Sequence, residues 1–199
     1  IYTSAIMMVL RFFAGSIVSR ISPLGLLAGS AVLAIIGLSS LAAATSLVAI
    51  FIAATVYAFG KTFFWPTTLA VVSEQTPKGG ALTLNAIGGI GMLAVGILGG
   101  PVIGAITEKT AETAIVTQTS AETYAKVSKD GSYVLGSYKA IDAEKVATLS
   151  KTDKATAEKI TAAREGANQG ALAKIAMFPM FMLACYIGLI LWFRSRGGY

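Results

Sequence analysis

Long apolar stretches limit what this chain can fold into more than any other feature. Five stretches of about 20 residues, near 1–18, 24–44, 47–72, 82–106 and 172–193, contain few or no charges. At 1.5 Å per residue, a helix needs about 20 residues to cross a hydrocarbon core of about 30 Å. We therefore predict an all-α membrane protein with five transmembrane helices.

One segment differs sharply from the rest. Residues 107–171 are rich in Lys, Glu, Ala, Thr and Ser and contain no apolar run long enough to span a membrane. We expect a polar insert of 60-odd residues before the last helix, with a hairpin around Asp130-Gly131 and helices in 142–170. The expected parts are helices in 1–106, the insert in 107–171, the last helix in 172–193 and a tail in 194–199.

The net charge of +6 belongs to the apolar part of the chain. The insert carries nine basic and nine acidic residues, whereas the remainder has seven basic residues and the single acid Glu74. Short loops with Lys or Arg favour the cytoplasm, which places Arg20, Lys78 and the Arg194/Arg196 tail inside and the insert outside. We expect a bacterial inner (plasma) membrane protein with a cytoplasmic C-terminus, whose partner is the lipid bilayer and not nucleic acid.

The first loop contains a recognisable motif. It reads G-S-I-V-S-R-I-S-P from Gly15 to Pro23. This resembles the cytoplasmic loop between the eighth and ninth helices of the major facilitator superfamily. Gly15 and Arg20 stand at the family's spacing, while Ser19 replaces the usual acid and Ser22 the second glycine.

A second motif, G-I-L-G-G-P-V-I-G-A, runs from Gly96 to Ala105. It resembles the glycine-proline pattern of the family's fifth and eleventh helices. Gly96, Gly100 and Gly104 recur every four residues, which lets another helix backbone approach closely, and Pro101 adds a local kink.

The resemblance identifies the five spans as helices eight to twelve, the C-terminal half of a major facilitator superfamily transporter. It implies an N-terminal half as partner and a small polar or anionic solute moved by alternating access, as in a symporter or antiporter. The insert lies outside the resemblance.

The third span carries a polar stripe at its centre. Lys61 lies about 20 Å from one end of the span and about 17 Å from the other, too far for its side chain to reach water. Charges at such depth usually face a bundle interior or an aqueous cavity and mark functional sites. Helical spacing aligns Tyr57, Lys61, Trp65 and Thr68, which we predict to be the substrate-binding residues. The family resemblance implies a cavity-lining helix here, which Pro66 would bend.

Other polar residues are candidates for gating or structure. Arg11 lies closer to the cytoplasmic end of its span, while Glu74 and Asn85 lie near the membrane edge, as gate or capping contacts. No Asp or Glu lies inside a predicted span, so a proton-coupling carboxylate would belong to other helices.

Two alternatives remain open. The first alternative is a membrane anchor whose insert binds a partner protein, although a bare anchor does not need Lys61. An enzyme is disfavoured, because histidine is absent and no intramembrane acid or metal-ligand cluster offers acid-base chemistry. With Cys185 as the one cysteine, we expect no disulfide, metal or cofactor within the chain.

Overall fold

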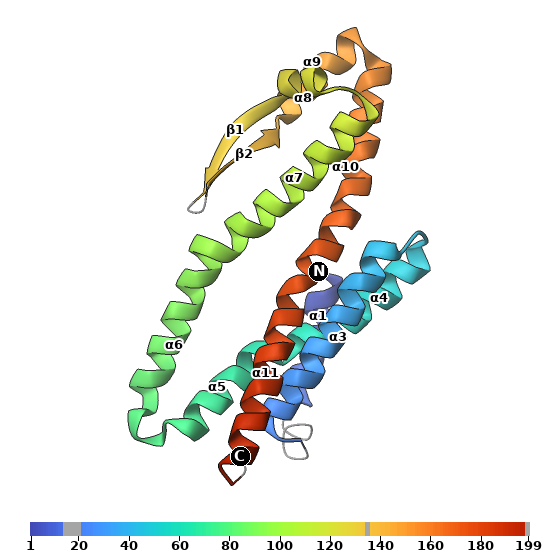
Figure 1. The fold of residues 1–199 in the computed structure, drawn as a ribbon. Helices are drawn as coiled ribbons and strands as arrows, with labels where there is room; N and C mark the ends of the chain where they lie inside the picture. The colour runs from blue at the N-terminus through green and yellow to red at the C-terminus, as the bar shows by residue number, and fades with distance from the viewer. Residues whose placement is uncertain (14–20, 134–135, 198–199) are drawn as a thin grey trace. The chain divides into compact units, whose positions relative to one another are not determined.

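Most of the chain is helical in the computed structural model, which describes residues 1–13, 21–133 and 136–197. It divides into two compact units (Figure 1): unit 1 is Ile1–Gly91 with Ala176–Tyr199, and unit 2 is Met92–Ile175. Four helical segments are long and apolar enough to cross a membrane, namely Pro23–Ala43, Leu47–Gln75, Pro77–Gln118 and Lys154–Ser195. These segments confirm four of the five predicted spans and indicate a membrane protein.

Unit 1 contains most of the apolar helices. Its elements are α1 (Tyr2–Phe12), α3 (Pro23–Ala43), α4 (Leu47–Thr62), α5 (Phe64–Gln75), the 3-10 turn η1 (Pro77–Gly79), most of α6 (Gly80–Ala94) and α11 (Met177–Ser195). Ser22 and Ser46 cap α3 and α4, because their hydroxyls accept hydrogen bonds from the backbone N–H of Gly25 and Ala49. The short uncharged turn expected near Thr45-Ser46 is confirmed.

The first predicted span is shorter than expected. Helix α1 has 11 residues and ends at Phe12, with Phe13 as its C-cap, and residues 14–20 lie outside the described part. Gly15 and Arg20, on which the first family motif depends, belong to that undescribed part. The transmembrane helix expected near 1–18 therefore stays a prediction.

Glycines bring α3 and α4 into backbone contact. A Cβ atom added at Gly37 would lie 2.5 Å from the Tyr57 backbone nitrogen, and one added at Gly60 would lie 2.5 Å from that of Ala34. Only glycine fits at such separations, so the two helices approach as closely as small residues allow. Gly60 directly precedes Lys61, and this packing therefore fixes the backbone that carries the lysine.

Three prolines interrupt the long helices. Pro66 cannot donate to the Thr62 carbonyl, and the helix breaks at Phe63 between α4 and α5. Pro179 has the same relation to Ile175, and α10 (Lys154–Ile175) gives way to α11 at Ala176. Before Pro101, a π-helical turn, η2 (Val95–Gly99), separates α6 from α7 (Gly100–Gln118). The expected interruptions at Pro66 and Pro101 are thus present.

Unit 2 has its own small core. It comprises the end of α6, η2, α7, α8 (Ala121–Val127), β1 (Ser128–Tyr133), β2 (Gly136–Ile141), α9 (Ala143–Thr152) and α10. The core residues are Ala111, Ile115, Tyr124, Val127, Ile141, Ile160, Ala163 and Ala167. Helix α7 runs through the predicted start of the insert at residue 107 without a break, so the composition change does not coincide with an element boundary.

The expected hairpin forms, but its turn is not at Asp130-Gly131. Strands β1 and β2 pair antiparallel, with Asp130 opposite Lys139 and Gly131 opposite Tyr138, so both residues lie within a strand. Residues 134 and 135, which connect the strands, lie outside the described part. Helices α9 and α10 confirm the helical expectation for 142–170, and each begins after an aspartate, Asp142 and Asp153, whose carboxylate accepts a backbone N–H.

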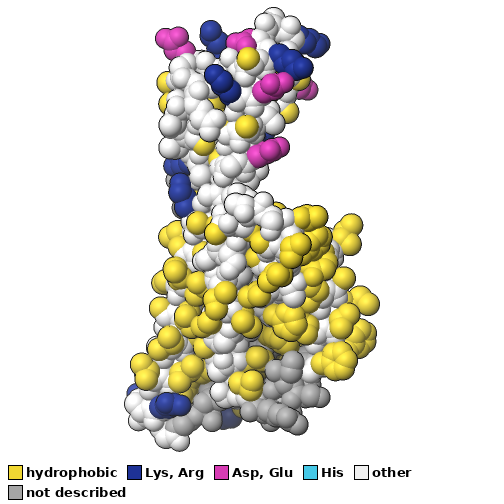
Figure 2. Space-filling model, turned by 90° about the vertical axis from the view of Figure 1, so that its right-hand side faces the viewer, with side chains coloured by type: hydrophobic (Ala, Val, Ile, Leu, Met, Phe, Trp, Pro, Cys, Tyr) yellow, Lys and Arg dark blue, Asp and Glu magenta, His cyan; other side chains and the backbone are white. Residues whose placement is uncertain are grey.

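The two units have different surfaces. Hydrophobic side chains crowd the face of unit 1 in Figure 2, whereas unit 2 shows scattered Lys, Arg, Asp and Glu side chains. Exposed large apolar residues occur on α1, α4, α6 and α11, and no residue of α6 is buried. Cys185 is exposed on α11. Such apolar surfaces are stable in lipid but not in water.

Candidate functional site

Lys61 makes two polar contacts within unit 1. Its ammonium group donates a hydrogen bond to the Thr3 hydroxyl of α1 over 3.2 Å and lies 5.3 Å from the centre of the Tyr57 ring. Tyr57 precedes Lys61 by one helical turn on α4, so the ring and the cation share a face. The structure thus brings two of the four predicted substrate-binding residues together.

Helix α4 contacts α1 through a second polar pair. The Tyr2 hydroxyl lies 2.7 Å from the Thr55 hydroxyl, and the Tyr2 ring meets Phe51 edge-on at 5.1 Å. Thr55 also donates to the Phe51 carbonyl of its own helix. Hydroxyl groups of both helices therefore hold α1 against α4. This packing positions Thr3 beside Lys61.

No carboxylate pairs with Lys61 among the described residues. The ion pairs found there join Lys129 to Asp142, Lys154 to Glu158 and Arg164 to Glu108, all in unit 2. A lysine ammonium has three N–H donors, and one is engaged by Thr3. The arrangement accommodates a cation with neutral partners and leaves it able to bind an anion.

The other two predicted binding residues contact different helices. The indole of Trp65 packs against Gly91 of α6, where an added Cβ atom would lie 2.9 Å from the ring. The Thr68 hydroxyl donates to the Phe64 carbonyl and interacts with the Tyr186 phenol of α11. The break at Phe63 thus divides the predicted stripe into a part that faces α1 and a part that contacts α6 and α11.

The candidate gating residues lie near helix ends or on exposed surfaces. Arg11 is exposed in the last turn of α1 and lines a shallow surface hollow with Met7, Met8 and Phe12. Glu74 is exposed in the last turn of α5. Asn85 is exposed inside α6, five residues after its first residue, so it does not cap that helix.

The predicted packing glycines face no other helix among the described residues. A Cβ atom added at Gly96 or Gly104 would meet nothing within 4 Å, and one at Gly100 would meet only the Val95 carbonyl of the adjacent π turn. Their role as a helix-packing face stays a prediction that requires a partner helix.

Three residues of the site were missed by sequence reasoning. Thr3 and Tyr186 lie in largely apolar helices, and nothing in the sequence says which helix each one faces. Gly60 was overlooked although Ser30, Ala34 and Gly37 on α3 form a spacing of small residues that could have indicated a close helix contact.

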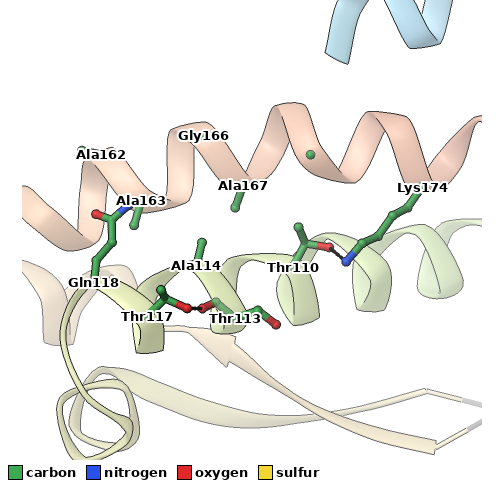
Figure 3. Close-up of a pocket in the computed structure, with 11 residues that line it drawn as sticks. Thr110, Thr113, Ala114, Thr117, Gln118, Ala162, Ala163, Gly166, Ala167 and Lys174 are labelled. Atoms are coloured by element: carbon green, nitrogen blue, oxygen red, sulfur yellow. Dashed lines mark hydrogen bonds between the residues drawn. The ribbon is translucent and has the colours of Figure 1, made fainter. Parts of the chain in front are cut away.

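Unit 2 contains a groove between α7 and α10. Figure 3 shows its lining, in which Thr110, Thr113 and Thr117 follow one face of α7 and small residues such as Ala163 and Gly166 face them. Each threonine hydroxyl donates to its own helix's carbonyl four residues earlier, and Lys174 donates to Thr110 over 3.0 Å. The groove therefore offers few free polar groups and no acid-base pair.

A charged cluster beside this groove joins the hairpin to the helices. Glu108 accepts hydrogen bonds from the Ile141 backbone N–H at 3.0 Å and from Arg164 at 3.2 Å. The Tyr124 hydroxyl donates to the Lys139 carbonyl. Burial of the phenol raises the pKa of Tyr124 to about 12, and the charges of Glu112 and Glu108 add to this shift while Arg164 opposes it. All of these groups have partners inside unit 2, which indicates a structural role.

Comparison with known proteins identifies no relative. No family model, curated protein or solved structure matches this chain.

Proposed function

We propose that this chain is part of a secondary active transporter, a symporter or antiporter of the major facilitator type, that moves a small polar or anionic solute by alternating access. Lys61 is the residue that binds the solute's anionic group, and the Tyr57 ring and Thr3 hydroxyl position its ammonium group. The single observation that carries this proposal is a lysine in an apolar helix whose partners in the described part of the chain are neutral.

Interruptions of the apolar helices support the same proposal. The break at Phe63 lies two residues after Lys61, and η2 and the break at Ala176 interrupt two further apolar segments. Interrupted helices near the bilayer midplane line the binding sites of many secondary transporters, where irregular backbone faces a cavity.

The proposed setting is a bacterial inner membrane. The positive-inside rule, applied to Lys78, Arg194 and Arg196, supports a cytoplasmic C-terminus and a polar insert on the outside. The N-terminal half of the transporter would supply the remaining wall of the cavity and any proton-coupling carboxylate. The proposal assigns no catalytic role to the chain.

A transport assay tests the role of Lys61. The full-length transporter is reconstituted in proteoliposomes and supplied with labelled monocarboxylates, dicarboxylates, organic phosphates and neutral sugars. We expect Lys61→Ala to lower uptake of an anionic solute about tenfold or more, because a hydrogen bond to a charged group is lost. Lys61→Arg keeps the charge and should retain part of the uptake.

Lys78→Gln is the matched control, since Lys78 is an exposed lysine in η1 and not a neighbour of Thr3 or Tyr57. Uptake of every anion at the wild-type rate by a folded Lys61→Ala variant would exclude the proposed site.

A second candidate function is favoured by the separate core of unit 2. In that reading the chain is a membrane anchor whose extracytoplasmic insert binds a partner protein. A shortened protein separates the two functions. Thr110 and Gly170 lie close together, since a Cβ atom at Gly170 would lie 3.6 Å from the Thr110 methyl group. A short Gly/Ser linker can therefore replace 111–169. The transport proposal expects uptake to persist, whereas the anchor proposal expects loss of the biological function with the helices intact.

A further inference from the structure

The C-terminal end of α11 combines an exposed indole with two exposed arginines. Trp192 is 53% exposed, and the Arg196 guanidinium lies 5.1 Å from the centre of its ring. Phe193 meets the same indole edge-on at 5.2 Å, which holds the ring in place. Arg194 is exposed in the last helical turn. The indole and the guanidinium of Arg196 therefore form one preorganised group.

The surroundings of this group are basic. Glu74 is the single acidic side chain in the sequence of unit 1, and no described carboxylate forms an ion pair with Arg194 or Arg196. The end of α1, which carries Arg11, and the turn η1, which carries Lys78, lie toward the same end of unit 1 as the end of α11 (Figure 1). Cations thus exceed anions at this end.

The helix that leads to the group is suited to contact with lipid. Leu189 and Leu191 are exposed on α11 one turn before the arginines. When such a helix crosses a bilayer, its last turn reaches the headgroup layer, where tryptophan is enriched and arginine meets phosphate. A planar guanidinium binds two phosphate oxygens at once, and its stacking on the indole sets its orientation.

We propose that Trp192, Arg194 and Arg196 form a binding site for the headgroup of an anionic phospholipid. Arg196 binds the phosphate from its position over the indole, Arg194 adds a second positive charge, and the indole lies at the boundary between acyl chains and headgroups. This inference does not depend on the transport proposal. The competing explanation is that the arginines only stabilise the C-terminal end of the helix, where cations are favourable.

Tryptophan fluorescence provides the test, because Trp65 is the one other tryptophan in the chain. The Trp65→Phe protein, with Trp192 as sole reporter, is reconstituted in equimolar phosphatidylcholine and phosphatidylglycerol vesicles in which one lipid at a time is brominated. We expect brominated phosphatidylglycerol to quench Trp192 more strongly, with an enrichment of about fivefold for each arginine engaged.

The double variant R194Q/R196Q should quench equally with both lipids. Lys174→Gln is the matched control and should keep the wild-type preference, because Trp192 lies about 22 Å along α11 from Met177, beyond Lys174's reach. Equal quenching by both lipids in the parent protein would overturn the proposal. The proposal would also be overturned if R194Q/R196Q lost the same amount of α11 stability in pure phosphatidylcholine as in the mixed vesicles.

A second measurement covers the case in which Trp65→Phe does not fold, since Trp65 packs against Gly91. Phosphatidylglycerol retained per chain is then measured after detergent exchange with Trp65 intact. Less lipid retained by R194Q/R196Q than by Lys174→Gln supports the site, and equal amounts refute it.

Discussion

Lys61 shows how a cation is accommodated in an apolar helix without a fixed carboxylate. Placing a lysine at the centre of a bilayer costs about 2.5–3.5 kcal/mol on insertion scales. A hydrogen bond to a charged group contributes about 1.5–3 kcal/mol, and a cation–π contact contributes about 0.5–2 kcal/mol. The contributions of the Thr3 hydroxyl and the Tyr57 ring are therefore large enough to offset this cost. Folding does not require a solute anion.

Gly60 gives a prediction about the backbone beneath this lysine. We expect Gly60→Ala and Gly37→Ala each to destabilise the chain by about 1–3 kcal/mol, because the added methyl group would overlap the backbone of the facing helix. Unfolding by denaturing detergent in mixed micelles measures the change. Gly29→Ala on α3 is the matched control, since a Cβ atom there meets nothing within 4 Å, and an equal loss in that variant would contradict the explanation.

The raised pKa of Tyr124 predicts that the stability of unit 2 depends on pH. Its pKa is about 12 when folded and about 10 when unfolded. Below pH 10 both states keep the proton and the stabilisation is complete. As the pH rises from 10 through 12, the unfolded state loses its proton first, so the stabilisation is lost. The free energy of unfolding, measured by denaturant titration with circular dichroism, should therefore fall over this range, and less so in Tyr124→Phe than in the parent. An equal fall in both proteins would assign the effect to other groups, such as the lysines.

At the scale of elements, prolines determine where the long apolar segments break. Pro66 and Pro179 each lie three residues after a break, at Phe63 and Ala176, and each leaves one carbonyl without its usual helical donor. Such sites have a low cost of local bending, because one hydrogen bond is already missing.

Pro66→Ala should join α4 and α5 into one helix. Residue 66 then regains a backbone N–H that can donate to the Thr62 carbonyl, and we expect slower hydrogen exchange in 62–68. Under the transport proposal the same variant has slower uptake with an unchanged apparent affinity for the solute. Pro77→Ala in η1 is the control, and unaltered exchange in 62–68 of Pro66→Ala would show that the break has another cause.

Local patterns in the sequence predicted the elements better than the contacts between them. The spans at α3 and at α4 with α5 follow from hydropathy, and the helical content of 142–170 follows from its composition, whereas the division into α9 and α10 at Asp153 was not predicted. The position of the hairpin turn was wrong, because Asp130-Gly131 is a strong local turn signal that the strand pairing overrides. The contacts of Thr3 with Lys61 and of Gly60 with Ala34 join residues distant in the sequence, so no local pattern reveals them.

At the scale of the whole molecule, much of the apolar surface of α6 and η2 stays uncovered by other described residues, although Trp65 contacts α6 at Gly91. No residue of either element is buried, and the glycine face formed by Gly96, Gly100 and Gly104 meets no neighbouring helix. Helix association in lipid depends on close packing at small residues rather than on burial from water. An uncovered glycine face is therefore a place where a further helix can pack, which under the transport proposal belongs to the N-terminal half.

Gly104→Leu distinguishes packing against a partner from a role within the chain. A leucine at this open position should leave the free energy of unfolding of the chain within about 0.5 kcal/mol of the parent value, as for other substitutions at positions without a neighbouring side chain. In cells that also produce the tagged N-terminal half of the transporter, the same change should reduce the amount of chain that copurifies with the tag. Val102→Leu, which enlarges a half-buried residue on the side of α7 opposite Gly100 and Gly104, should not. Normal copurification of Gly104→Leu would remove the packing role, and a large loss of stability of the chain alone would show that the glycine is needed internally.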